Sequence, residues 1–239
     1  MTLTYLLLNI STLGMTLALS FDKRVAFFRQ WRALFPAIVI VGAGFILWDI
    51  LFTRMGVWAF NTDFTLGLPI WGLPLEEWMF FVTVPYACVF VYACLKVYIS
   101  KDYLKPISSA ISYGVLIISL IVGIIHLGKW YTSTTFLVLA ILMSANIWII
   151  KPSYIGRFYV SYMVSLIPFL IVNGILTALP VVIYNDLENL GLRIGTIPVE
   201  DTAYGFILQL ANVNIFEYLL SRSGTHSRTK VVTSSKISD

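Results

Sequence analysis

The chain alternates between long apolar stretches and short polar segments along most of its length. Each apolar stretch is close to the ~20 residues that an α-helix needs to cross the hydrocarbon core of a bilayer. Seven such stretches lie at about 3–20, 34–52, 74–97, 107–127, 132–150, 158–180 and 198–220. The pattern predicts an all-α polytopic membrane protein with seven transmembrane helices and with its two termini on opposite sides.

Composition supports the same fold class. Hydrophobic residues make up 59% of the chain and charged residues 12%, against roughly 45–50% and about 25% in soluble domains. The lipid bilayer is the expected surrounding, because so few charges cannot cover a surface in water. No basic segment precedes the stretch 3–20 and no small-residue cleavage site follows it. This predicts a retained helix rather than a signal peptide.

The basic residues are divided unequally between the two sets of polar segments. One set holds Lys23, Arg24, Arg29, Arg32, Lys96, Lys101, Lys105, Lys151, Arg157, Arg222, Arg228, Lys230 and Lys236. The other set holds Arg54, Lys129 and Arg193. Because basic loops stay in the cytoplasm, we expect a cell (inner) membrane protein with its N-terminus outside and its C-terminus cytoplasmic. Nucleic-acid binding is not expected, since the basic residues are spread over separate short loops.

The chain contains an internal repeat with an offset of 124 residues. At this offset Asp49 falls on Asn173, Thr53 on Thr177, Asn61 on Asn185, Gly67 on Gly191, Pro74 on Pro198, Glu76 on Glu200 and Glu77 on Asp201. Two three-helix repeats, 1–105 and 129–220, are expected around a connecting helix, 106–128, before a disordered cytoplasmic tail, 221–239. This 3+1+3 order makes the repeats parallel, related by an axis along the membrane normal, with one composite site between them.

Acidic pairs begin two of the predicted helices, and each pair closely follows a proline. Proline followed by acids is also an ordinary helix start. Ionisable groups at the edge of the hydrocarbon region are costly, however, and are usually functional. Six polar residues are expected to collect at the outer end of the bundle as catalytic candidates: Asp49, Glu76, Glu77, Asn173, Glu200 and Asp201. Adjacent helical residues point about 100° apart, so Glu76 and Glu77 cannot both face one cavity.

Such a cluster can perform acid chemistry. Neighbouring carboxylates and an apolar wall favour the protonated acid, whereas a helix N-terminus favours ionisation, and the sequence leaves this balance open. A neutral carboxylic acid beside a dry pocket can protonate an alkene, and aromatic faces stabilise the resulting cation. Candidate cation-stabilising or substrate-binding residues are Trp48, Trp58, Trp78, Phe80, Phe81 and Tyr204. A role in the interfacial aromatic belt stays open for each of them.

No cofactor or metal is expected. Gly42-Ala43-Gly44 lies inside the second apolar stretch rather than between a strand and a helix, so it is no dinucleotide fingerprint. His126 and His226 have no metal-ligand partner at a usual spacing. Cys88 and Cys94 share one apolar stretch, which excludes a disulfide framework and a cysteine zinc site.

Two parts of the chain resemble the membrane-integral lycopene cyclases, which occur as bacterial heterodimers and as fused archaeal and fungal chains. The first part is Pro74-Leu75-Glu76-Glu77-Trp78-Met79-Phe80-Phe81, with Pro85-Tyr86-Ala87-Cys88 after it. The second part is Asn173-Gly174-Ile175-Leu176-Thr177, followed by Pro198-Val199-Glu200-Asp201. The resemblance extends from about residue 3 to 220 and indicates the fused form.

This resemblance implies cofactor-independent, acid-driven closure of the linear ends of lycopene to β-rings, giving γ-carotene and then β-carotene. It implies that the acidic pairs carry the chemistry. Glu77 or Asp201 is the expected proton donor or its partner, with Asp49 and Asn173 orienting them. Lycopene and other linear carotenoids are the expected ligands, and contact with other enzymes of the carotenoid pathway stays open.

Two alternatives stay open at this point. A proton-coupled small-solute transporter can also use parallel three-helix repeats, but its site should lie near the bilayer midplane rather than at one end. A carotenoid hydratase, in which water quenches a similar cation, is poorly separated by sequence.

Overall fold

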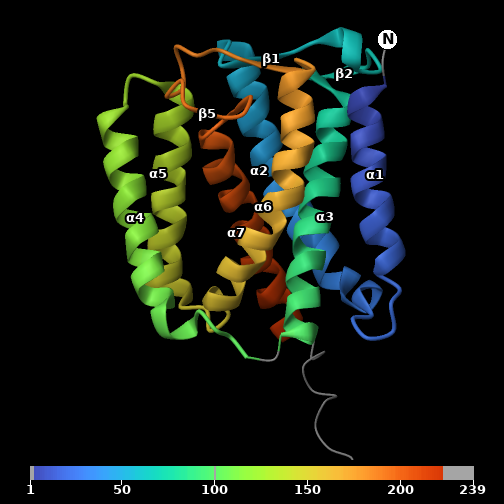
Figure 1. Cartoon of the computed structure of the whole chain (residues 1–239), viewed down its shortest axis with the longest axis vertical. Helices are drawn as coiled ribbons and strands as arrows, with labels where there is room; N and C mark the ends of the chain where they lie inside the picture. The colour runs from blue at the N-terminus through green and yellow to red at the C-terminus, as the bar shows by residue number, and fades with distance from the viewer. Residues whose placement is uncertain (1–2, 100, 223–239) are drawn as a thin grey trace, which may run out of the picture.

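Seven long helices run side by side in the computed structural model, which describes residues 3–99 and 101–222 (Figure 1). They are α1 Thr4–Leu19, α2 Trp31–Met55, α3 Leu75–Tyr98, α4 Ser108–Ile125, α5 Trp130–Ser144, α6 Ile155–Ala178 and α7 Glu200–Arg222. A short π-helical segment, η4 Ala145–Ile150, continues α5. Each helix coincides with one predicted apolar stretch, so the prediction of an all-α, seven-helix membrane protein is confirmed.

The outward faces of the helices are suited to lipid. Within the described residues, five helices are long and apolar enough to cross a membrane by themselves, while α1 is shorter and α7 is more polar. Large apolar side chains such as Val39, Ile141 and Ile167 are about two-thirds exposed. Polar side chains lie inside instead: on α7, Gln209 is buried and donates to Ser161 Oγ at 3.0 Å. An apolar exterior around a partly polar interior is the arrangement expected in a bilayer.

Short strands cover one end of the bundle, called here the strand-bearing end. They are β1 Trp58–Phe60, β2 Pro69–Ile70, β3 Leu73–Pro74, β4 Val182–Tyr184, β5 Arg193–Ile194 and β6 Ile197–Pro198. Hairpins β2–β3 and β5–β6 lead directly into α3 and α7. Short helical turns complete the connections: η1 Phe27–Gln30, η2 Thr62–Phe64 and η3 Lys105–Ile107.

The internal repeat is visible in the strands as well as in the helices. Strands β4, β5 and β6 follow β1, β2 and β3 at the predicted offset of 124 residues. Antiparallel strands β1 and β4 pair so that Ala59 lies opposite Ile183, its own equivalent in the second repeat. A residue paired with its duplicate marks a two-fold axis between the halves. The predicted parallel relation of the repeats is therefore confirmed.

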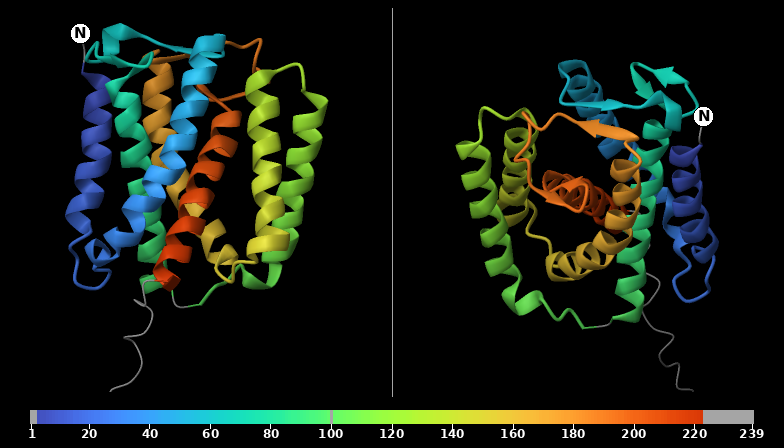
Figure 2. Two further views of the ribbon diagram at one scale, coloured as in Figure 1. Left: turned by 180° about the vertical axis from the view of Figure 1, so that it is seen from behind. Right: turned by 45° about the horizontal axis from the view of Figure 1, so that its top comes forward.

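Helix packing brings the two repeats together around α7. Helix α2 contacts α7 and α3 contacts α6 across the repeats, while α1 packs on α3, α5 packs on α7, and α4 packs on α5 at the outside. Figure 2 shows α7 enclosed by the other helices, with α4 at the edge. The domain boundaries at 105, 128 and 220 stay predictions. The tail predicted to be disordered lies outside the described residues from position 223 onward.

Candidate active site

Four of the six predicted polar residues line one cavity between the repeats, near the strand-bearing end. Asp49 comes from the end of α2, Asn173 from α6, and Glu77 and Asp201 from the first turns of α3 and α7. All four side chains are buried. The cavity measures about 50 Å³, which is room for roughly one or two water molecules.

Asp201 accepts three hydrogen bonds and is the best-satisfied acid in the cavity. Tyr131 donates its hydroxyl to Oδ1 at 2.5 Å. Asn173 Nδ2 and the Tyr184 hydroxyl both donate to Oδ2, each at 2.9 Å. Three donors aimed at one carboxyl group stabilise its ionised form, because a carboxylate is an acceptor only. These bonds oppose the effect of burial, which favours the neutral acid.

Tyr184 lies on β4, outside the helices, and its phenol is protonated. Burial, and then the neighbouring Asp201 carboxylate, raise the pKa of Tyr184 well above its ordinary value of 10.0. The phenol therefore keeps its proton and remains a hydrogen-bond donor to Asp201.

Glu77 and Asp49 form a pair of acids on the opposite repeat. Tyr5 donates its hydroxyl to Glu77 Oε2, and the Asp49 carboxyl group lies within hydrogen-bonding reach of Glu77. Two carboxyl groups bond to each other only when one of them carries a proton. The indole N–H of Trp58 is buried beside the same Asp49 carboxyl group. Two buried carboxyl groups in contact disfavour carrying two charges, which favours one proton shared between them.

Comparison of the repeats shows how the same scaffold supports two different chemistries. In the second repeat an amide, Asn173, donates to the acid on the neighbouring helix. The equivalent position in the first repeat is Asp49, which needs a proton to make the same bond. Tyr184, the third donor to Asp201, is replaced in the first repeat by Phe60, which has no hydroxyl. The first repeat therefore lacks two of the donors that the second repeat directs at its acid.

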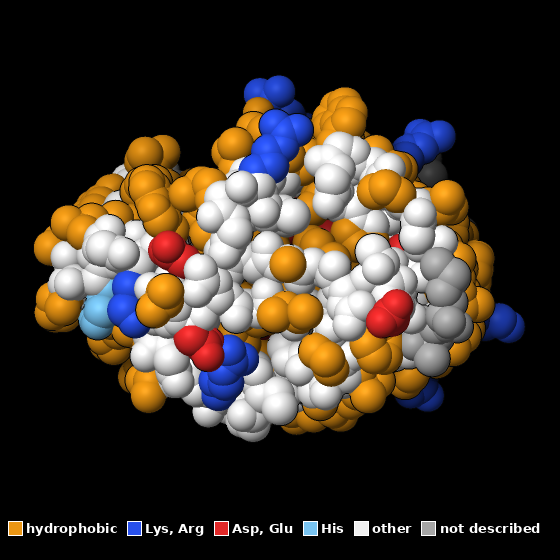
Figure 3. All heavy atoms as spheres, turned by 90° about the horizontal axis from the view of Figure 1, so that it is seen from above, with side chains coloured by type: hydrophobic (Ala, Val, Ile, Leu, Met, Phe, Trp, Pro, Cys, Tyr) orange, Lys and Arg blue, Asp and Glu red, His pale blue; other side chains and the backbone are white. Residues whose placement is uncertain are grey.

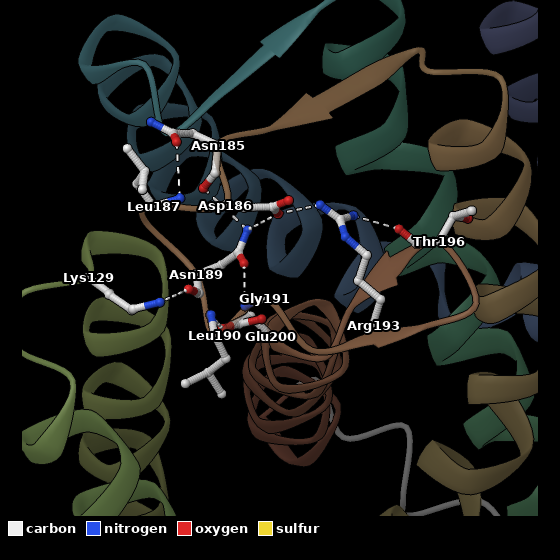
Figure 4. Close-up of polar contacts among 10 residues, drawn as sticks. All are labelled: Lys129, Asn185, Asp186, Leu187, Asn189, Leu190, Gly191, Arg193, Thr196 and Glu200. Carbon is white, nitrogen blue, oxygen red and sulfur yellow. Dashed lines mark hydrogen bonds and ion pairs between the residues drawn. The ribbon is translucent and has the colours of Figure 1, made fainter.

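Glu76 and Glu200 are turned away from the cavity and hold the loops. Glu76 Oε1 accepts the Leu66 backbone N–H at 2.6 Å, and Glu200 Oε1 accepts the Leu190 backbone N–H at 2.7 Å (Figure 4). Both side chains are fully buried. The expected six-residue cluster is therefore a four-residue cluster, because consecutive helical positions face directions about 100° apart. That rule was part of the sequence prediction, and the geometry agrees with it.

The loop that precedes α7 is built from further polar contacts. Asn189 Oδ1 accepts the Gly191 N–H at 2.7 Å, and Lys129 donates to the Asn189 carbonyl. Arg193 bonds Asp186 at 2.5 Å and the Thr196 carbonyl at 2.7 Å (Figure 4). These bonds fix the hairpin that sets the start of α7, and with it the position of Asp201.

The aromatic candidates are divided between the cavity and its surroundings. Trp58, Phe80 and Tyr204 line the cavity. Trp48 does not line it but packs against Tyr204, with 5.2 Å between ring centroids. Trp78 and Phe81 line a separate groove of about 910 Å³ on the outer face of α1, α2 and α3. Trp78 points about 100° away from Glu77 on the helix. Phe81 lies one turn beyond Glu77 and packs against Phe45, with 6.0 Å between ring centroids.

Eight side chains that line the cavity were not among the predicted candidates: Tyr5, Phe60, Tyr131, Phe169, Leu176, Val182, Tyr184 and Leu208. Tyr5 and Tyr131 donate to the two acids but are 126 residues apart, so the offset of 124 does not align them. Phe60 and Phe169 also line the cavity. No feature of the sequence distinguishes these two positions from other apolar positions in the chain. Aligning the first helices of the two repeats, α1 and α5, at an offset of 126 residues instead of 124 would have matched the two tyrosines.

Metal ligands are not grouped in the described part of the chain. No three His, Cys, Asp or Glu side chains in residues 3–99 and 101–222 are arranged to hold a metal ion. His226 lies outside these residues. The expectation that the chain needs no cofactor stays a prediction.

A family model described as "Lycopene cyclase" matches residues 2–95 and 128–219. The two matched segments cover more than half of the chain and correspond to the two repeats, with α4 between them. The chain belongs to the lycopene cyclase family. No curated protein and no solved structure matches the chain. Membership in the lycopene cyclases makes a carotenoid the substrate of this membrane protein, and it places all four cavity polar residues inside the matched segments.

The cavity of this lycopene cyclase is narrow. Backbone and uncharged side chains cover most of the strand-bearing end (Figure 3). A cavity of about 50 Å³ is too small for the branched hydrocarbon end of a carotenoid, which is several times larger than a water molecule. The end group therefore reaches the carboxyl groups only if surrounding side chains move.

Proposed function

We propose that this enzyme closes the two linear ends of lycopene to β-rings by acid catalysis without a cofactor, giving γ-carotene and then β-carotene. The observation that carries the proposal is the pairing of Asp49 with Glu77, across an aromatic-lined cavity from the triply hydrogen-bonded Asp201. The proposal assigns the Asp49–Glu77 pair as the proton donor and Asp201 as the anion, since cyclisation through a carbocation needs both in one apolar space.

The chemistry needs no oxidant or reductant. The proton shared by Asp49 and Glu77 adds to the terminal double bond, whose π electrons form the new C–H bond and leave a cation on the neighbouring carbon. The next alkene attacks this cation and closes the ring. Loss of a proton from the ring carbon beside the new cation forms the ring double bond. A cavity carboxylate takes up that proton, so the product is an isomer of the substrate.

The walls of the cavity stabilise the cation. Asp201 supplies a fixed negative charge, which is most effective in a site that excludes water. The faces of Trp58, Phe80 and Tyr204 supply electron density to a cation beside them. Because the repeats differ at Asp49 and Asn173, they form one site rather than two. The two ends of lycopene are therefore cyclised in turn.

Expression in a lycopene-accumulating bacterium tests the proposal. The wild-type chain should convert lycopene to a bicyclic product, and each ring closed in deuterated water should carry one deuterium from the acid. A hydratase would instead yield an acyclic product heavier by one water molecule. Lycopene recovered unchanged, with the protein present in the membrane, would reject the cyclisation.

Glu76 is proposed to hold the loop rather than to transfer a proton. Glu76→Gln should keep turnover close to the wild-type rate, because the amide oxygen can still accept the Leu66 N–H. Glu76→Ala removes that acceptor and should lower the free energy of unfolding by about 1–3 kcal/mol. Thermal unfolding and initial rates measure the two effects. A large loss of turnover in a stably folded Glu76→Gln variant would instead make Glu76 part of the acid chemistry.

The strand-bearing end is proposed to lie on the side of the membrane opposite the cytoplasm, together with the N-terminus. The asymmetry of Lys and Arg supports this orientation. In a background without Cys88 and Cys94, Leu187→Cys in the exposed β4–β5 loop should react with a membrane-impermeant maleimide in intact cells. Lys151→Cys, between α5 and α6, should react only after permeabilisation. The reverse labelling pattern would invert the orientation.

A further inference from the structure

Two aromatic side chains separate the carboxylate cavity from a groove on the outer surface of the bundle. This groove, called here the α1–α3–α6 groove, measures about 360 Å³. Its walls include Met15 of α1, Ala87 and Val91 of α3, and Val172 of α6. Phe80 and Phe169 line both the groove and the carboxylate cavity. These two rings are therefore the partition between the two spaces.

A second connection lies beside Phe169. A small space of about 10 Å³ shares Phe169 and Leu208 with the carboxylate cavity, and it shares Val84 and Cys88 with the α1–α3–α6 groove. The three spaces thus adjoin one another in sequence.

The groove offers a hydrocarbon surface although hydroxyl groups occur in it. Ser11 and Thr16 bond to carbonyl groups of their own helix, at 2.7 Å to Leu7 and 2.9 Å to Thr12. Their polar atoms are already satisfied, so they offer little to a polar ligand. On α3 the lining extends from Phe80 to Val91, which is about 16 Å along the helix axis. A long, thin, apolar molecule suits these walls.

Phe169 is placed where its ring can move. The ring lies on Gly205 of α7, where an added Cβ would stand only 3.3 Å from it. Pro168 precedes it within α6 and removes one hydrogen bond from the helix. A ring that packs on a glycine, at a turn of its helix with one hydrogen bond fewer, is the part of the partition that we expect to move.

The larger groove on α1, α2 and α3 differs in one decisive respect. It measures about 910 Å³, but none of its lining residues lines the carboxylate cavity. Size alone would favour this groove, whereas continuity with the acids favours the α1–α3–α6 groove.

We propose that the α1–α3–α6 groove binds the polyene chain of the linear carotenoid from the lipid phase, and that Phe80 and Phe169 part to admit its end to the acids. The inference rests on the proposed function, because a cyclase must bring a hydrocarbon end into the small cavity that holds the acids. The occupant is the hydrophobic chain of the substrate, and the groove sets its orientation.

A matched pair of alanine-to-tryptophan substitutions tests the proposal. Ala87→Trp fills the α1–α3–α6 groove, and Ala43→Trp places the same side chain in the larger groove. With purified enzyme in lipid vesicles, Ala87→Trp should raise the KM for lycopene about tenfold or more at an unchanged kcat, because it removes binding of the non-reacting chain. Ala43→Trp should leave both constants near the wild-type values. Equal effects of the two substitutions would overturn the proposal.

Binding without turnover separates this inference from the proposed function. In an Asp49→Asn background, the circular dichroism induced in the polyene absorption band reports lycopene held by the protein. The signal should persist with Ala43→Trp and disappear with Ala87→Trp. Should Ala87→Trp fail to fold, Val91→Trp fills the same groove one turn further along α3. Bound lycopene that no variant displaces overturns the groove assignment, whereas a wild-type protein that binds lycopene but never cyclises it overturns the proposed function alone.

Discussion

Asp49→Asn is expected to abolish ring closure while leaving the protein folded. The substitution makes the first repeat identical to the second at this position, where Asn173 donates to its acid at 2.9 Å. An asparagine at position 49 can make the equivalent bond to Glu77, but the pair then loses its shared proton. Because a positioned general acid contributes about 10²–10⁴-fold to a rate, kcat should fall by that factor. Initial rates of β-ring formation and the melting temperature measure the two parts of the prediction.

The control for this substitution is Asp63→Asn, at an exposed position in the β1–β2 connection at the same end of the molecule. It removes a carboxylate of the same kind without touching the cavity, so the rate should stay close to that of the wild type. Glu77→Gln should lose activity as Asp49→Asn does, since it breaks the same acid pair. If Asp49→Asn instead retained most of its turnover, the proton would have to come from another group.

Asp201→Asn is expected to reduce both turnover and stability. The amide cannot accept the three hydrogen bonds that the carboxylate accepts from Tyr131, Asn173 and Tyr184, since one of its two polar atoms is itself a donor. Donors left without an acceptor should lower the free energy of unfolding by about 1–3 kcal/mol. Loss of the fixed negative charge should lower kcat by about 10²–10³-fold. Steady-state kinetics and thermal unfolding of purified protein measure both effects.

Tyr184→Phe provides a graded comparison for Asp201→Asn. It removes one donor of three and reproduces the phenylalanine found at the equivalent position 60. Turnover should therefore fall less than in Asp201→Asn, because the charge remains. Full activity in Asp201→Asn would show that the cation needs no anion at this position. A loss in Tyr184→Phe as large as that in Asp201→Asn would indicate that Tyr184 itself takes part in proton transfer.

Duplication explains how one site acquired two chemical roles. The repeats place a tyrosine from α1 or α5 and a side chain from α2 or α6 against the acid that begins α3 or α7. A single change at the second of these positions, acid in one repeat and amide in the other, decides whether the local group shares a proton or holds a charge. The scaffold is symmetric, whereas its chemistry is not.

The sequence alone determined the helices, the repeat and the end of the bundle at which the acids lie. Hydrophobic length and the polar, proline and glycine matches between Asp49–Pro74 and Asn173–Pro198 are properties of the chain itself. They do not depend on how the helices rotate against one another. For this reason the helix boundaries, the parallel relation of the halves and the division of direction between Glu76 and Glu77 were predictable.

Only the tertiary structure decided which side chains meet. The bonds from Tyr5 to Glu77 and from Tyr131 to Asp201 join residues 72 and 70 positions apart, and they depend on how far each helix is shifted along its neighbour. Glu76 and Glu200 look equivalent to their neighbours in the sequence, yet packing turns them toward loop amides. The cavity and its aromatic partition likewise exist only after distant helices pack, because a cavity is the space that several side chains leave between them.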